Sequence, residues 1–201
     1  RTFRKTVKEE KADCILIGEN WHDANAYLHG DEFDGIMNYA FTKACLDFYA
    51  FDKFSPKQMS DKLNEILMRN TDTVNLMMLN LLDSHDTDRF LTRVKGDKDK
   101  LMSAIALNYF FVGTPCIYYG TEIAMEGGYD PDNRRCMDWV KAEEDTPLKK
   151  LIKTLTALKS SGGLSGAKIK IYEEDGLLIA ERTKYVLAIN QSGKCRKYAA
   201  D

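Results

Sequence analysis

Residues 81–90 read Leu-Leu-Asp-Ser-His-Asp-Thr-Asp-Arg-Phe, and they mark the point where an apolar run turns into a dense polar cluster. The apolar residues of 76–82 stop there, and Asp83, His85 and Asp86 follow at once. This pattern is typical of a buried strand that delivers polar groups to the end of a sheet. A strand end followed by a solvated turn would give the same charge cluster.

A second stretch favours the first interpretation. Residues 13–22 read Asp-Cys-Ile-Leu-Ile-Gly-Glu-Asn-Trp-His, so a predicted apolar strand over 14–17 is followed by Gly18 and one carboxylate, Glu19. Two strands that each end in a carboxyl group suit chemistry that needs two acids across one bond.

Strand and helix patterns alternate up to about residue 163, and only strands follow. We expect helices at 2–11, from Ser55, at 98–112 and from Thr146, with strands at 14–17, within 33–41, at 74–82 and at 116–119. Ser55, Pro56 and Gln58 form a capping-box pattern. Three short strands are predicted at 168–172, 177–182 and 185–190, with a turn at Asp175-Gly176.

The fold class is therefore α/β over residues 1–163, followed by the start of a β domain over 164–201. Four strand–helix units with chemistry at the strand ends describe half of a (β/α)8 barrel, which usually needs about 250 residues when complete. A doubly wound sheet fits the same periodicity, but no glycine-rich phosphate loop follows any predicted strand.

Composition narrows the function classes. Hydrophobic residues make up 44% and charged residues 30% of the 201 residues, which favours a packed globule over a disordered chain. The net charge of −2 gives no reason to expect nucleic acid or an anionic membrane as partner. No apolar run approaches the roughly 18 residues of a membrane span. Five scattered cysteines without a CxxC pair favour reduced thiols and a cytoplasmic protein. The chain opens Arg-Thr-Phe without an initiator methionine, and we expect it to be a piece of a longer protein.

Three motifs resemble those of the α-amylase superfamily of glycoside hydrolases, family 13. Residues 17–24 resemble the strand-5 motif, residues 82–87 the strand-7 motif and residues 113–122 strand 8, in that order. The Trp-His pair after Glu19 and the segment 127–135 resemble the neopullulanase, cyclomaltodextrinase and maltogenic amylase branch. Ser84 departs from the asparagine common in the wider superfamily. The resemblance implies the C-terminal half of a (β/α)8 barrel, strands 5 to 8, and the start of a β-sandwich domain.

The resemblance also implies roles for the polar residues. Glu19 would be the general acid/base of a retaining glycosidase, and Asp86 the carboxylate that stabilises the transition state, with His85 beside it. The family's nucleophile is an aspartate at the end of strand 4, in an Arg-Leu-Asp context that this sequence does not contain. We therefore expect the 201-residue chain alone to be inactive.

Four further residues are candidates for substrate binding by the same resemblance. Trp21 and His22 would contact sugar, although packing of their own loop is an alternative; Asp130 and Arg134 would bind the neighbouring glucose unit, or form a surface ion pair. A lone His-Asp pair is a weak metal signal, so we expect no metal and no cofactor.

The function implied is hydrolysis of α-1,4-glucosidic bonds in cyclodextrins, pullulan or maltooligosaccharides. The alternatives are a transglycosylating relative, such as a branching enzyme or trehalose synthase, and a catalytically inactive interaction module. Retention of both Glu19 and Asp86 argues against the inactive module. Half a barrel leaves open strand edges, and we expect Ile15, Leu16, Ile117 and Tyr118 to be exposed there. A two-fold homodimer would cover these edges; a monomer with helices over the gap is the alternative.

Overall fold

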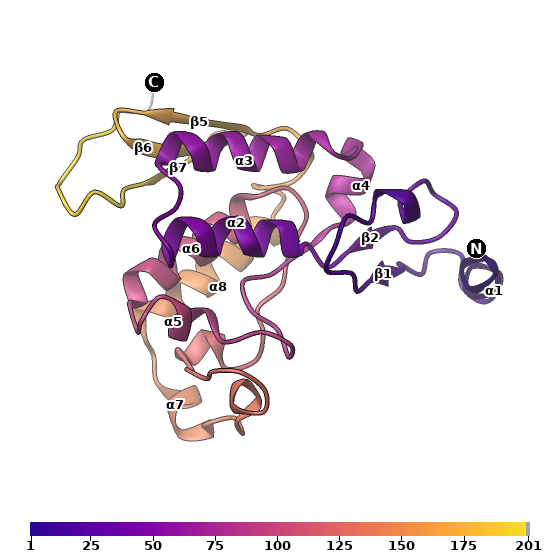
Figure 1. Ribbon diagram of the computed structural model, residues 1–201, viewed down its shortest axis with the longest axis horizontal. Helices are drawn as coiled ribbons and strands as arrows, with labels where there is room; N and C mark the ends of the chain where they lie inside the picture. The colour runs from indigo at the N-terminus through magenta and orange to yellow at the C-terminus, as the bar shows by residue number, and fades with distance from the viewer. Residues whose placement is uncertain (200–201) are drawn as a thin grey trace.

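The computed structural model describes residues 1–199 (Figure 1). Four short parallel strand segments follow one another along its chain. β1 (Ile17–Gly18) pairs with β2 (Gly35–Ile36), and β3 (Leu79–Asn80) pairs with β4 (Thr114–Pro115). A parallel bridge between Met37 and Leu79 joins the two pairs. Consecutive parallel neighbours of this kind confirm the α/β class of this part of the chain.

Helices separate and cover these strands, and four of them begin within one residue of where the sequence predicts. They are α1 (Thr2–Glu10), α2 (Tyr39–Tyr49), α3 (Pro56–Met68), α4 (Asp72–Met77), α5 (Phe90–Arg93), α6 (Lys98–Phe110), α7 (Trp139–Glu143) and α8 (Pro147–Ser160). Short 3-10 turns occupy Asn25–Tyr27, Thr121–Ile123 and Asp132–Arg134. Among residues 1–199, no helix combines the length and apolar character that crossing a membrane requires.

The capping box at the start of α3 is confirmed. Gln58 N donates to Ser55 Oγ at 3.3 Å, and Ser55 N donates back to Gln58 Oε1 at 2.9 Å. Pro56 occupies the first turn, where its missing N–H would have no intrahelical partner. This helix end is therefore determined by residues within one turn of each other.

The predicted strand at 74–82 is wrong over its first half. Asp72–Met77 form helix α4, because Thr71 caps it by accepting a hydrogen bond from Val74 N. Only Leu79 and Asn80 pair as a strand. A short apolar run fits a buried strand and a helix equally well by periodicity, and the cap decides here.

The other predicted barrel strands are displaced. Pairing of the first begins only at Ile17, and pairing of the last involves Thr114–Pro115 instead of residues 116–119. Of the four residues expected to be exposed at open strand edges, Ile15 is exposed, Leu16 is only 7% exposed, and Ile117 and Tyr118 are half-buried. Side chains alternate between the two faces of an extended segment, so Leu16 points opposite to its neighbours.

The three C-terminal strands form the predicted antiparallel sheet in the order β5 (Lys170–Glu174), β6 (Leu177–Arg182) and β7 (Tyr185–Ile189). Asp175 and Gly176 both have positive φ, 49° and 75°, as a two-residue type I′ hairpin turn requires. Figure 1 shows this sheet lying over α3.

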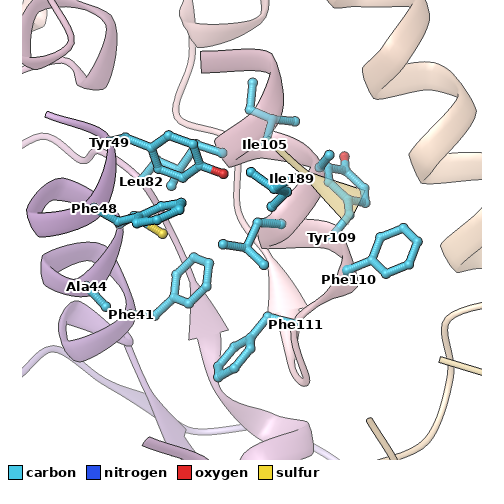
Figure 2. Close-up of a cluster of buried hydrophobic side chains, with 14 of the residues drawn as sticks. Phe41, Ala44, Phe48, Tyr49, Leu82, Ile105, Tyr109, Phe110, Phe111 and Ile189 are labelled. Atoms are coloured by element: carbon cyan, nitrogen blue, oxygen red, sulfur yellow. The ribbon is translucent and has the colours of Figure 1, made fainter. Parts of the chain in front are cut away.

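One hydrophobic core joins this sheet to the helices. Figure 2 shows side chains of α2, α6 and β7 gathered in a single cluster that includes Phe41, Phe48 and Ile189. The buried Arg182 of β6 donates to Phe110 O at 3.0 Å and Phe111 O at 3.2 Å, where α6 ends. A cation at a helix C-terminus satisfies carbonyls that have no intrahelical partner. The sheet therefore packs directly on the helices, and a domain boundary at residue 163 stays a prediction.

Candidate active site

Glu19, His85 and Asp86 come together at one edge of the parallel strands. Glu19 follows β1 directly, and the other two lie on the turn after β3. His85 Nε2 lies 3.6 Å from Glu19 Oε1 and 3.3 Å from Asp86 Oδ2. The side chains remain 37–45% exposed, so a ligand can reach all three. The two strand-end clusters identified in the sequence thus form one site, because the carboxyl ends of parallel strands meet at the same edge.

Tyr39 is a site residue that the sequence reasoning missed. It begins α2, just after β2, and is 6% exposed. Its hydroxyl lies 3.5 Å from Glu19 Oε1 and 3.3 Å from Ser84 Oγ. Burial raises the pKa of Tyr39, so the phenol keeps its proton and can donate to the carboxylate. The rule that polar groups follow a strand end, applied to β2 as well, would have found it.

Trp21 lies beside the site through its contact with Tyr39. The two rings stack with centroids 3.8 Å apart and an interplanar angle of 13°. Half of the Trp21 surface nevertheless stays exposed. Trp21 and His22 also line a cavity of about 220 Å³ between their loop, α2 and the end of α3. Trp21 can therefore serve both predicted roles, packing of its loop and contact with a ligand. His22 lines the cavity and, in the described part of the chain, makes no side-chain hydrogen bond or ion pair with the three central residues.

Arg134 connects the segment after β4 to the central residues. Its Nε lies 2.9 Å from Asp130 Oδ1 and donates to His85 O at 2.9 Å, and its Nη2 lies 3.2 Å from Asp86 Oδ1. Asp130 and Arg134 do form the ion pair that the sequence allowed. The same guanidinium also reaches Asp86, so the pair belongs to the site.

Asp83 is the one carboxyl of the polar cluster that lies inside the protein. It is 3% exposed and accepts hydrogen bonds from Phe90 N at 2.9 Å and Thr121 Oγ1 at 3.0 Å. Burial raises the pKa of Asp83. Its contacts tie the turn that carries His85 and Asp86 to the segment after β4.

The same three central residues offer donors for a metal ion. One atom each of Glu19, His85 and Asp86 lies within 4.8 Å of the others, although acidic groups this exposed are common without any metal. Sequence reasoning had paired only His85 with Asp86. The prediction that no metal binds stays a prediction.

A family model and several curated proteins are similar to this chain. The model of the α-amylase catalytic domain matches residues 1–160. The cyclomaltodextrinase of Thermoanaerobacter pseudethanolicus is 44% identical over 159 residues, which cover 79% of this chain and 28% of that protein. The intracellular maltogenic amylase of Bacillus subtilis is 42% identical over 159 residues, covering 79% of this chain and 27% of the relative.

Two solved structures are also similar to this chain. The maltogenic amylase from S. marinus superposes with a TM-score of 0.84 at 30% identity, covering 96% of this chain and 29% of that one. The cyclic α-maltosyl-(1→6)-maltose hydrolase from Arthrobacter globiformis, in complex with that sugar, superposes with a TM-score of 0.83 at 31% identity, covering 89% and 41%. This chain thus spans less than a third of the two curated relatives named above.

Proposed function

Since this chain belongs to the α-amylase catalytic-domain family, we propose that it supplies the general acid/base, Glu19, and the transition-state-stabilising carboxylate, Asp86, of a retaining α-glucan hydrolase. The observation that carries this proposal is the convergence of Glu19, His85 and Asp86 at one exposed edge. We further propose that the chain forms strands 5 to 8 of a (β/α)8 barrel and the start of the following β domain. The nucleophile would come from an upstream strand 4.

The geometry of the site supports separate roles for Glu19 and for Asp86 with His85. Glu19 would protonate the leaving oxygen while the upstream carboxylate attacks the sugar, and would then activate water against the glycosyl intermediate. Tyr39, within 3.5 Å of Glu19 Oε1, holds the orientation of that carboxylate. Asp86 and His85 would bind hydroxyl groups of the sugar as positive charge develops in its ring.

The substrate class proposed is an α-1,4-linked glucan: a cyclodextrin, pullulan or a maltooligosaccharide. The names of the relatives, cyclomaltodextrinase, maltogenic amylase and neopullulanase, support it. The half-exposed Trp21 ring offers an apolar face on which a sugar ring can stack, and Arg134 and Asp130 offer polar partners for a neighbouring unit. A cytoplasmic location is proposed on the name of the intracellular relative.

A transglycosylating relative would use the same residues, with a sugar hydroxyl in place of water. An assay of products separates the two reactions. The test uses what we call the complete-barrel protein, in which this chain is joined to the upstream half of the barrel. Incubation with β-cyclodextrin should release linear maltooligosaccharides whose new reducing ends are α-anomers by NMR. Inverted β-anomers, or no cleavage, would contradict the proposal; longer products than substrate would support transfer.

For the chain without an upstream half, we propose a two-fold homodimer in which two half-barrels cover each other's open edges. The exposed side chains of Ile15, just before β1, and of Ile17, in β1, support it. Light scattering at micromolar concentration should give twice the chain mass of 22.9 kDa. A single species at the monomer mass would refute the dimer.

A further inference from the structure

Asn133 has all of its side-chain hydrogen bonds, within residues 1–199, on the turn that carries His85 and Asp86. Its side chain is fully buried. Asn133 Nδ2 donates to His85 O at 2.6 Å and Thr87 O at 2.9 Å, and lies 3.5 Å from Ser84 O. Asn133 Oδ1 has no partner in the same described part of the chain. The N–H groups of Asn133 Nδ2 therefore fix the orientation of the amide, because they face three backbone carbonyls of one turn.

Arg89 holds the backbone of Asn133 from the other side. Arg89 is fully buried, and its Nε donates to Asn133 O at 2.8 Å. Its guanidinium lies 4.2 Å from the ring centre of Tyr118 and 4.7 Å from that of Tyr119. Its backbone N–H donates to Gly127 O at 2.9 Å. A cation held against two rings and hydrogen-bonded at its edge cannot move without breaking several contacts.

We propose that Asn133 is a positioning residue for the reaction: it sets where His85 and Asp86 stand relative to Glu19. This inference rests on the proposed function. Its neighbour Arg134 donates to the same carbonyl of His85 and to the Asp86 carboxylate. The segment after β4 therefore bonds both to the backbone of the turn, at His85 O, and to the Asp86 carboxylate that the turn carries.

Only a primary amide suits this position. An alanine would remove the donor of Thr87 O, whereas His85 O would keep Arg134 Nε and Ser84 O would keep Thr87 N. A buried acceptor left without a partner costs more than a lost hydrogen bond. An ionised aspartate has no proton to donate to these carbonyls. A displacement of about 1 Å in a catalytic group can cost on the order of 10²-fold in rate. The loss should fall on kcat, because Asp86 acts mainly on the transition state.

The test compares Asn133→Ala with Asn108→Ala in the complete-barrel protein. Asn108 is also fully buried and has an unpaired Oδ1 in the described part of the chain. Its side chain donates to Cys116 O at 3.4 Å and, within residues 1–199, makes no hydrogen bond to the turn that carries His85 and Asp86. Asn133→Ala should lower kcat on a maltooligosaccharide by about 10- to 100-fold with little change in KM. Asn108→Ala should lower the Tm to a similar degree and leave kcat within about twofold. An unchanged kcat for Asn133→Ala, or an equal loss in both variants, would overturn the proposal.

Asn133→Ser, which keeps one hydroxyl donor, carries the same test if the alanine variant does not fold. Its kcat should lie between the wild-type and alanine values. A serine variant that folds with wild-type kcat would also count against the proposal.

A second measurement does not depend on catalytic activity. In the 201-residue chain, the ring Cε1–Hε1 NMR signal of His85, assigned with His85→Gln, should shift in Asn133→Ala and stay in place in Asn108→Ala. If the His85 signal does not shift in Asn133→Ala, the positioning role of Asn133 is wrong. If the wild-type complete-barrel protein shows no turnover, the proposed function is wrong. The two failures are thereby distinguishable.

Discussion

His85 Nε2 and Glu19 Oε1 lie 3.6 Å apart, although the two residues follow different strands of the parallel set. Their approach depends on β2, which lies between β1 and β3 and bridges both. Tyr39, at the end of that middle strand, contacts Glu19 and Ser84 at once. The site is thus assembled from three successive strand ends.

Glu19→Gln should abolish most turnover in the complete-barrel protein and leave glucan affinity nearly unchanged. Glutamine keeps the size of the side chain but cannot give a proton to the leaving oxygen. A role of this kind contributes about 10²–10⁴-fold to kcat. The control is Glu174→Gln, the same change at an exposed position of β5. Steady-state kinetics on a maltooligosaccharide decide it, and a loss of less than about tenfold would remove Glu19 from the acid/base role.

Asp86→Asn should lower kcat more than it raises KM. The hydrogen bonds of Asp86 with the sugar strengthen as positive charge develops, so the carboxylate acts chiefly on the transition state. Asp88→Asn is the matched control, because Asp88 lies two residues away and bonds to Arg93 at 2.9 Å outside the site. If KM rose and kcat stayed constant, Asp86 would be a ground-state binding residue only.

The 201-residue chain alone should not hydrolyse cyclodextrin or an activated maltoside. A retaining mechanism needs a second carboxylate about 5–5.5 Å from the acid/base, and we assign that group to an upstream strand. The measurement is a long incubation of the purified chain with each substrate. Robust turnover that disappears in Glu19→Gln would mean that another residue of this chain, such as Asp83 or Asp130, serves as nucleophile.

Acid should weaken the attachment of α1 through Asp34. Arg4 Nη1 donates to Asp34 Oδ1 at 2.8 Å, and Leu16 N donates to Asp34 Oδ2 at 2.8 Å. Burial by itself raises the pKa of Asp34, but the hydrogen bonds from Leu16 and Arg4 outweigh it, so this pKa lies below its ordinary value of 3.8. Such a carboxylate stabilises the fold fully above its unfolded-state pKa, and the contribution is lost as pH falls through the lower folded-state value.

Thermal unfolding followed by circular dichroism from about pH 7 to about pH 2 tests this. Asp34→Asn should lower the Tm at neutral pH and show a smaller further fall in acid than the wild type. Asp61→Asn, which removes an exposed pair with Lys57 on α3, should change the Tm little. Parallel pH curves for wild type and Asp34→Asn would contradict the role of Asp34.

The sequence by itself determined the features that depend on neighbours along the chain. The capping box of Ser55 and Gln58, the hairpin turn at Asp175 and the polar residues that follow β1 and β3 were all predicted from local pattern. Each depends on backbone geometry or on contacts within a few residues, so the amino acids present are sufficient to specify it.

The tertiary structure alone decided which distant residues meet. Asn133 carries no local signal of a site, yet it holds the turn of His85. Tyr39 carries only the signal of a polar residue that follows a strand end, and its contact with Glu19 depends on the fold. Arg89 looks like one more charge of a polar cluster, but it is fully buried against two tyrosine rings. These roles arise from hydrogen bonds and stacking between segments that only the folded chain brings together, and such contacts leave no periodic pattern in the sequence for local reasoning to detect.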